Sequence, residues 1–408
     1  MFKNVVVGQS GGPTAVINSS LAGVYKTAKE MGAQKVYGMR YGIQGFLEKN
    51  LIDLGEKFGS ELNIEVLKRT PSAYLGSCRF KLPNVTDNQE MYETIFGILD
   101  EYEIDAFFYI GGNDSMDTIK KLSQYAESIN SPIRFMGVPK TIDNDLAAMD
   151  HTPGYGSAAK YIATVTKELI RDGLAYDMKF ATVIEVMGRN AGWLTAATAL
   201  AKGEDCEGVD LIYLPELPFD IDKFTAKVRE LFAKKKNVVI AVSEGVKSPD
   251  GKYVFERAND NGTVDAFGHR ELSGTARYLA SVLKQEFGCK TRIIELASLQ
   301  RCAGHLTSRV DITEAYQVGG TAVKAAYEGE TGKVVTLERI STDPYICTTG
   351  IHDVREIANV EKKVPLEWII NEGTYVSDDL VHYIMPLIQA ELSPIMITGQ
   401  PRHIVVDR

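Results

Sequence analysis

The stretch AFFYIGGNDSMDTIKKLSQYAES, residues 106–128, decides the fold class of this chain. Residues 106–110 are bulky and apolar, which is typical of a strand buried on both faces of a sheet. Gly111 and Gly112 end the strand, and residues 115–128 repeat apolar side chains with the period of a helix. A strand that passes through glycines into a helix predicts one unit of a parallel α/β sheet.

The same unit recurs along the chain. Further strand-like segments occupy 4–8, 133–138, 179–186, 209–214, 237–242, 292–298 and 333–340. Helical patterns occupy 15–31, 155–174, 193–201, 222–236, 274–287 and 378–392. We therefore expect an α/β chain with mostly parallel sheets that helices cover on both faces.

The composition excludes several classes of protein. With 408 residues, 44% hydrophobic and 24% charged, the chain is too apolar to be disordered. Its net charge of −9 argues against a basic surface for nucleic acid or an anionic membrane. Five scattered cysteines without a C-x-x-C pair favour a reducing compartment, and no apolar run has the length of a membrane span. We expect a cytoplasmic protein.

Two glycine turns follow strands where doubly wound sheets bind their ligands. Gly11 and Gly12 lie between the first strand and its helix, which suits a phosphate at a helix N-terminus or a tight turn without ligand. No G-K-[ST] follows, so this is not a Walker loop. In the turn after Ile110, Asp114 and Ser115 suit either a helix N-cap or contact with Mg²⁺ and phosphate.

The heptad PKTIDND, residues 139–145, is the most informative turn. In an extended chain Asp143 and Asp145 point the same way, and their repulsion raises at least one pKa unless a cation such as Lys140 lies close. A base beside a cation at a strand end suits phosphoryl transfer. A surface turn with a salt bridge is the simpler alternative.

A fourth turn, EVMGRNAG at 185–192, also leads from a strand into a helix. Arg189 lies near the helix start, where the helix dipole disfavours a cation unless an anion lies between them. The turn therefore favours a bound phosphate over a structural ion pair.

These turns resemble those of the 6-phosphofructokinases. The matching motifs are GGNDS at 111–115, PKTIDND at 139–145, EVMGR at 185–189, SGGPTAVIN at 10–18, LGSCR at 75–79, SEG at 243–245 and an R-x₈-R pair at 292 and 301. Together they span roughly residues 4 to 330. The resemblance implies a phosphofructokinase fold of two Rossmann-like lobes. It places the phosphoryl donor on residues 1–150 with 300–345, and the sugar phosphate on 151–299 with 346–408.

The resemblance also implies a role for each residue of the site. Catalytic roles fall to Asp143, Lys140, Asp114 and Arg189. The diphosphate would bind at Gly11, Gly12, Arg79 and Lys140. Fructose 6-phosphate would bind at Thr141, Asp143, Met187, Gly188, Arg189, Glu244, Arg292, Ser298 and Arg301. One arginine at the 6-phosphate comes from a neighbouring subunit in this family, which implies a homodimer or homotetramer.

The phosphoryl donor is indicated by Asp114 and Lys140, which replace two glycines of the ATP-dependent relatives. Glycine leaves room for a nucleotide, whereas aspartate fills that space and lysine pairs with a small, highly charged donor. This pair resembles the pyrophosphate-dependent members, which transfer phosphate reversibly between pyrophosphate and fructose 6-phosphate in glycolysis and gluconeogenesis. An ATP-dependent phosphofructokinase is the main alternative. A silent regulatory subunit and a lipid or NAD kinase fit the motifs less well.

The resemblance further implies Mg²⁺ as cofactor, with Asn113 and Asp114 as candidate ligands. Asn113 stands where the family usually carries an aspartate, and an asparagine carbonyl is a weaker, neutral ligand. Ser298 stands where ATP-dependent relatives often carry a histidine near the sugar phosphate.

Overall fold

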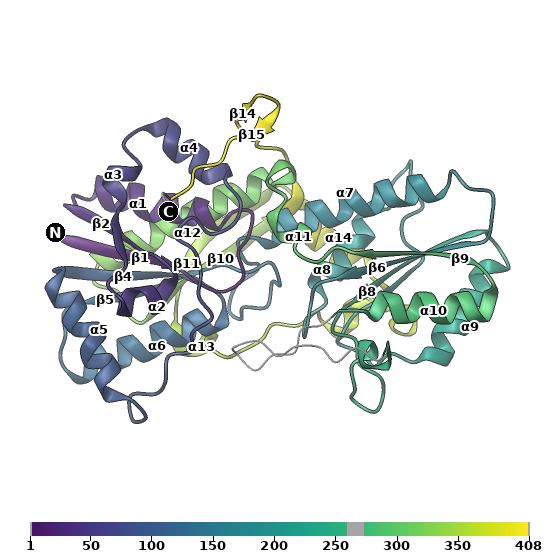
Figure 1. The fold of residues 1–408 in the computed structure, drawn as a ribbon, viewed down its shortest axis with the longest axis horizontal. Coiled ribbons are helices and arrows are strands. Elements are labelled where there is room, and N and C mark those ends of the chain that lie inside the picture. Colours follow the sequence, from purple (N-terminus) through teal and green to yellow (C-terminus); the bar gives the residue numbers. More distant parts are fainter. Residues whose placement is uncertain (1, 259–272, 407–408) are drawn as a thin grey trace.

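The computed structural model describes residues 2–258 and 273–406, and in it the chain forms two α/β lobes around two sheets. The lobes lie side by side along the long axis of the molecule (Figure 1). The first sheet has seven strands in the order β11-β10-β5-β4-β1-β2-β3, and the second has four in the order β7-β8-β6-β9. The α/β class predicted from the strand–glycine–helix units is confirmed.

The first sheet is parallel except at its edges, where β3 and β11 run antiparallel to β2 and β10. Its strands are β1 (Asn4–Gln9), β2 (Lys35–Met39), β3 (Leu51–Asp53), β4 (Ile104–Gly111), β5 (Arg134–Pro139), β10 (Lys333–Thr342) and β11 (Tyr345–Asp353). The helices of this lobe are α1 (Ile17–Glu30), α2 (Gly42–Leu47), α3 (Leu54–Lys57), α4 (Glu61–Arg69), α5 (Gln89–Glu101), α6 (Asn113–Ser128), α12 (Arg309–Tyr327) and α13 (Val354–Ile357).

Helices cover both faces of this sheet because its central strands are apolar on both sides. Val5 and Val7 of β1 pack in one cluster with α1 and α12, whereas Val6 packs in a second cluster with α5 and α6. This alternation follows from the two-residue period of a strand. Because helices cover both faces of the sheet, the carboxyl ends of its strands are the place where a site can form.

The second sheet is parallel throughout. Its strands are β6 (Phe180–Val186), β7 (Leu211–Tyr213), β8 (Asn237–Ser243) and β9 (Lys290–Glu295). The helices of this lobe are α7 (Tyr155–Gly173), α8 (Trp193–Ala196), α9 (Ile221–Phe232), α10 (Thr275–Phe287), α11 (Leu299–Cys302) and α14 (Asp378–Ile384). Short pairs of strands, β12 (Ile369–Ile370) with β13 (Tyr375–Val376) and β14 (Met396–Ile397) with β15 (Gln400–Pro401), complete the described fold.

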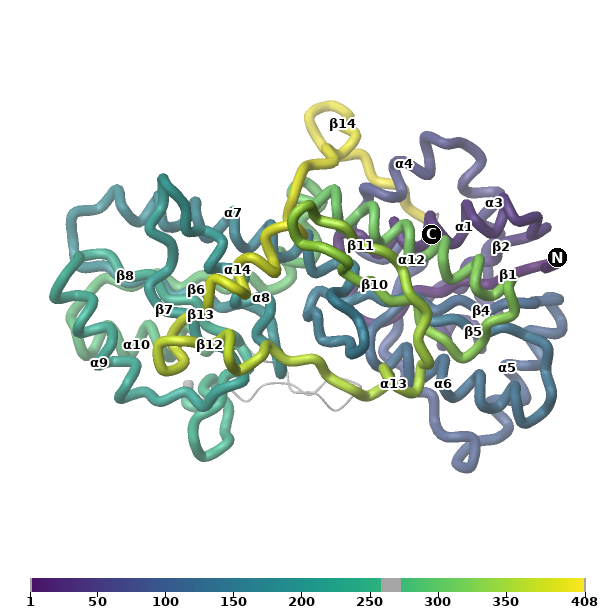
Figure 2. Tube along the Cα trace, turned by 180° about the vertical axis from the view of Figure 1, so that it is seen from behind, coloured from purple at the N-terminus to yellow at the C-terminus, as the bar shows by residue number. Residues whose placement is uncertain are grey.

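The chain crosses between the lobes more than once, and the boundaries differ from those expected (Figure 2). Residues 346–408 were expected in the second lobe, but β11 pairs with β10 of the first sheet. Near the C-terminus, Ile404 and Val406 pack on the core of the first lobe. An antiparallel edge strand and a returning tail carry no glycine turn, which is why the sequence pattern did not locate them.

No helix in the described part of the chain is long and apolar enough to cross a membrane. All five cysteines are free thiols.

Candidate active site

The turn 139–145 leaves β5 and folds back on itself. The amide of Asp143 donates to Thr141 Oγ1 at 3.1 Å, and Thr141 Oγ1 lies 3.4 Å from Asp143 Oδ2. Asn144 adopts a left-handed φ of 55°, which reverses the chain, and its Oδ1 accepts from the amide of Thr152 at 3.1 Å. The turn is therefore not the extended stretch assumed for Asp143 and Asp145. Both carboxylates nevertheless remain close enough to Lys140 to interact with its charge.

Lys140 is buried directly beneath the first glycine turn. Its ammonium donates to the carbonyl of Gly12 at 2.8 Å, and a Cβ added to Gly11 would lie 3.1 Å from Nζ. Burial lowers the pKa of Lys140 to about 8, although the charges of Asp143, Asp145 and Asp114 oppose that shift. Lys140 therefore interacts with residues that follow β1, β4 and β5, so the carboxyl ends of these three strands meet at its side chain.

The glycine turn also brings an arginine to the same place. A Cβ on Gly12 would lie 3.2 Å from Nη1 of Arg301, which α11 carries over from the second lobe. Gly11 has a φ of 76°, a conformation that favours glycine, and its carbonyl accepts from Ser77 Oγ at 2.6 Å. The backbone conformation therefore favours glycine at position 11, and both glycines leave room for the ends of the Lys140 and Arg301 side chains.

Asp143 is the carboxylate best placed to act as a base. Burial raises its pKa, while Lys140, the hydroxyl of Thr141, Arg301 and Arg189 oppose the rise. The side chain stays partly exposed, so a substrate can reach it. The pKa of its neighbour Asp145 is raised to about 7, by burial first and then by the charges of Asp143 and Glu361.

The turn after β6 faces Asp143 from the second lobe. Gly188 has a φ of 143°, and a Cβ there would lie 2.6 Å from the carbonyl of Ala191. The amide of Gly188 donates to Glu244 Oε1 at 3.4 Å, and Ser243 Oγ donates to the carbonyl of Gly188. The pKa of Glu244 is raised to about 8, by burial first and in smaller part by the charge of Asp143.

Most of the residues predicted for the site converge. The converging group comprises Gly11, Gly12, Asp114, Lys140, Thr141, Asp143, Gly188, Arg189, Glu244 and Arg301. Met187 belongs to the same turn, and its amide lies 3.4 Å from Gln300 Oε1. Ser298 precedes α11, which carries Arg301, and Arg79 is exposed at the end of the loop that contains Ser77.

Arg292 does not join this group within one chain. It pairs with Asp172, and its guanidinium lies 5.0 Å from the ring centroid of Phe180. Its partner in the sheet is Thr182, whereas the active-site turn begins at Met187. Those positions are about 16 Å apart at the rise of a strand. Within one subunit, therefore, Arg292 lies away from the other site residues, and the expected clamp on one phosphate would need Arg292 of a neighbouring subunit.

Asn113 opens α6 with a buried carbonyl oxygen. Among the described residues its Oδ1 has no hydrogen-bond partner. Leaving a buried acceptor without a donor is costly, so such an atom calls for a ligand or water. Asp114, next along the same first turn, is exposed. This pair of oxygen donors fits a hard cation such as Mg²⁺, which prefers oxygen ligands.

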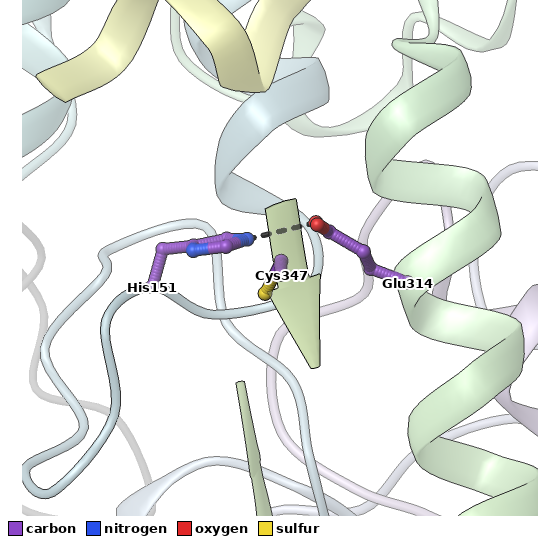
Figure 3. Close-up of side chains that lie close together, drawn as sticks. All are labelled: His151, Glu314 and Cys347. Carbon is purple, nitrogen blue, oxygen red and sulfur yellow. Dashed lines mark hydrogen bonds and ion pairs between the residues drawn. The ribbon is translucent and has the colours of Figure 1, made fainter. Parts of the chain in front are cut away.

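Next to the turn 139–145 lies a second polar cluster that sequence analysis missed. Figure 3 shows His151 pointing at Glu314 of α12, with Cys347 of β11 beside them. The ring nitrogens of His151 lie 2.8 Å from Asp150 and 2.8 Å from Glu314, and Tyr345 donates to Glu314 at 2.6 Å. Each of these polar groups already has a hydrogen-bond partner. The bonds fix the loop after Asp145 to α12 and β11, and we call this cluster of Asp150, His151, Glu314 and Tyr345 the clamp.

The clamp predicts a pH-dependent stability. Burial alone would lower the pKa of His151, but hydrogen bonds to Asp150 and Glu314 outweigh it, so the pKa is raised. The imidazolium therefore stabilises the fold fully below the unfolded pKa of about 6.5, and this contribution disappears as pH rises through the folded pKa. We expect His151→Gln to lose about 2 kcal/mol or more at pH 6, with a smaller loss at pH 9. Urea unfolding of both proteins at the two pH values measures this. A loss that grows with pH would contradict the clamp.

The chain belongs to the phosphofructokinase family, whose pattern it matches over residues 4–326. It is 40% identical to a pyrophosphate–fructose 6-phosphate 1-phosphotransferase of Halomonas elongata, over 98% of this chain and 95% of that protein. It also resembles the crystal structure of a pyrophosphate-dependent phosphofructokinase from Nitrosospira multiformis. That likeness has a TM-score of 0.89 and 39% identity, and covers 98% of this chain and 96% of the other. An ATP-dependent 6-phosphofructokinase of Streptomyces coelicolor is 32% identical over 80% of this chain and 88% of its own length.

Proposed function

We propose that this protein is a pyrophosphate:fructose-6-phosphate 1-phosphotransferase that makes fructose 1,6-bisphosphate and phosphate reversibly. The observation that carries the proposal is Lys140, whose buried ammonium donates to Gly12 and interacts with Asp114. The resemblance to the family implies that these two side chains fill positions that glycine occupies in its ATP-dependent members. The greater identity to the pyrophosphate-dependent relative than to the ATP-dependent one supports the same donor.

In the forward reaction Asp143 accepts the proton of the sugar 1-hydroxyl. The sugar oxygen then bonds to the nearer phosphorus of pyrophosphate, the bridging P–O bond breaks, and inorganic phosphate leaves. Lys140 and Arg189 balance the negative charge that spreads over the transferred phosphoryl group. Because donor and product are both small phosphate compounds, the same site can run in reverse.

We also propose Mg²⁺ as the cofactor. The unpartnered Oδ1 of Asn113 and the carboxylate of Asp114 are the residues that would hold it, together with pyrophosphate oxygens. When bound, Mg²⁺ would neutralise charge on the diphosphate. Asn113 is neutral, so we place more of the binding on Asp114 and on the substrate.

For the acceptor we propose that Arg301 binds the 6-phosphate within one subunit and that Arg292 acts on a neighbouring subunit. The separation of Arg292 from the turn that begins at Met187 in its own subunit supports this arrangement. The active protein would then be a homodimer or homotetramer in the cytoplasm, without nucleic acid or membrane partners.

The test is steady-state kinetics of the natural protein with pyrophosphate and with ATP. We expect turnover with pyrophosphate and Mg²⁺ in both directions, loss of activity in excess EDTA, and at least about a 100-fold lower kcat/KM with ATP. A preference for ATP would support the alternative, an ATP-dependent 6-phosphofructokinase. Absence of reverse turnover from fructose 1,6-bisphosphate and phosphate would also count against the proposal.

A further inference from the structure

Residues 358–364, here named the crossing segment, join α13 in the first lobe to β12 in the second. They lie outside the part of the chain that matches the family pattern, which ends at residue 326. In Figure 2 this segment runs along one side of the molecule from lobe to lobe. Its contacts reach both turns that carry the proposed reaction.

On one side the crossing segment contacts the Asp143 turn, residues 139–145, and the loop that follows it. The amide of Lys362 donates to the carbonyl of Asp145 at 2.7 Å, and Glu361 forms an antiparallel bridge with Leu146. The ammonium of Lys362 donates to the carbonyls of Asp150 at 2.6 Å and Met149 at 3.2 Å. The backbone of the loop that follows Asp143 is therefore tied to this segment at several points.

On the other side the segment holds the turn that carries Arg189. Asn190, the next residue, donates from Nδ2 to Glu361 Oε1 at 2.7 Å. Trp193 Nε1 donates to the carbonyl of Lys362 at 3.0 Å. Glu216 Oε1 accepts from the amides of Gly192 at 2.8 Å and Val364 at 3.0 Å, which joins the same turn to the segment a second time.

A third attachment reaches the helix that opens with Asn113 and Asp114. Asn359 Nδ2 donates to Asp117 Oδ1 of α6 at 3.0 Å. Positions 359, 361 and 362 therefore contact helix α6, the Arg189 turn and the Asp143 turn, respectively. Packing alone does not require these contacts, because an apolar connection between lobes would stabilise the lobes equally well.

We propose that the crossing segment sets the position of the Asp143 turn relative to the Arg189 turn, with Glu361 and Lys362 as positioning residues for phosphoryl transfer. Neither side chain needs to touch substrate for this role. A displacement of about 1 Å between reacting groups can cost about 100-fold in rate, so loosening this link lowers kcat. This inference rests on the proposed function only in that kcat of the proposed phosphoryl transfer is the quantity measured.

A double-mutant cycle on Glu361→Ala and Asn190→Ala tests the link. If the two side chains act through their mutual hydrogen bond, each variant lowers kcat about 10-fold and the double variant lowers it no further. KM for both substrates is expected to stay within about 3-fold, because substrate contacts are intact. Multiplied effects, or a kcat unchanged in both single variants, would overturn the proposal.

Glu367→Ala is the matched control. It removes the same charge from an exposed side chain in the connection just after the segment, and kcat should not change. At Lys362, Lys362→Met is expected to lower kcat about 100-fold, and Lys362→Arg is expected to restore part of it. An arginine variant as slow as the methionine variant, with both proteins folded, would argue against positioning by this cation.

Trp193 gives a readout that does not depend on activity. The chain has two tryptophans, and Trp193 is 3% exposed beneath the segment. In a Trp368→Phe background, Glu361→Ala should shift Trp193 emission to longer wavelength, whereas Glu367→Ala should not. The kinetic cycle is run with whichever donor supports turnover, so failure of the pyrophosphate assignment leaves this test intact. Unshifted emission in Glu361→Ala would count against the segment as the link.

Discussion

Replacing Asp143 by asparagine is expected to lower kcat by about 10³-fold while leaving KM for fructose 6-phosphate within a few-fold. A positioned general base contributes about 10²–10⁴-fold, and the amide of asparagine cannot accept the hydroxyl proton. Binding changes little because Arg301, Gly188 and Glu244 still surround the site. Steady-state kinetics with the proposed donor measures both constants. A kcat within 10-fold of the natural value would remove Asp143 from the role of base.

The same substitution is not expected to destabilise the protein. Burial raises the pKa of Asp143, which means that the fold already disfavours its charge. A neutral side chain of the same shape relieves that cost, although Lys140 loses a neighbouring charge. An unfolding midpoint equal to or above that of the natural protein, together with the loss of kcat, separates a catalytic effect from misfolding.

The pH profile of the natural enzyme follows from the same carboxylates. Asp143 must be ionised to accept a proton, and both its pKa and that of Asp145 are raised, the latter to about 7. Activity should therefore fall on the acid side at a pH well above the ordinary aspartate range, because the pair gains a proton there. An acid limb near pH 4 would contradict this environment.

The sequence predicted the fold class because the local pattern and the tertiary fold agree in the central strands. Apolar residues 4–8 and 106–110 lie in β1 and β4, and the glycines that follow form the expected turns. The antiparallel edge strand β11 was not predicted, since it alternates weakly and lies half exposed. Its place in the first sheet depends on pairing with β10, which no single window of sequence contains.

The turns that form the candidate site could also be predicted from local sequence. The crossing segment that contacts these turns could not. Lys140, Asp143 and Arg189 stand out because charged residues at the end of an apolar strand are unusual. The crossing segment acts largely through backbone groups, such as the amide of Lys362 and the carbonyl of Asp145. Such hydrogen bonds leave no mark on residue type. Spacing along the chain does not show that Arg292 lies away from the other site residues within one subunit, because that depends on the register of β9 beside β6.

Replacing Lys140 by methionine is expected to abolish most pyrophosphate-dependent turnover, by about 10³-fold in kcat/KM. The variant would lack the ammonium that donates to the carbonyl of Gly12 and that, in the proposed reaction, lies beside the transferred phosphoryl group. Losing this cation would also raise the pKa of Asp143 further, since Lys140 is the charge that most opposes the rise. More of the base would then be protonated near neutral pH. Lys223→Met, which removes an exposed lysine from α9, is the control and should leave turnover unchanged.

The pair Asp114→Gly and Lys140→Gly tests donor selection more sharply. The double variant should lose pyrophosphate turnover at least as completely as Lys140→Met, because both charges beside the diphosphate are gone. Room for a nucleotide would then exist, but ATP turnover need not appear, since no residue has been shaped to bind adenosine. If the double variant kept pyrophosphate activity within about 10-fold, Lys140 and Asp114 could not be the residues that select the donor. Loss with pyrophosphate accompanied by an unchanged KM for fructose 6-phosphate would locate their effect on the donor side of the site.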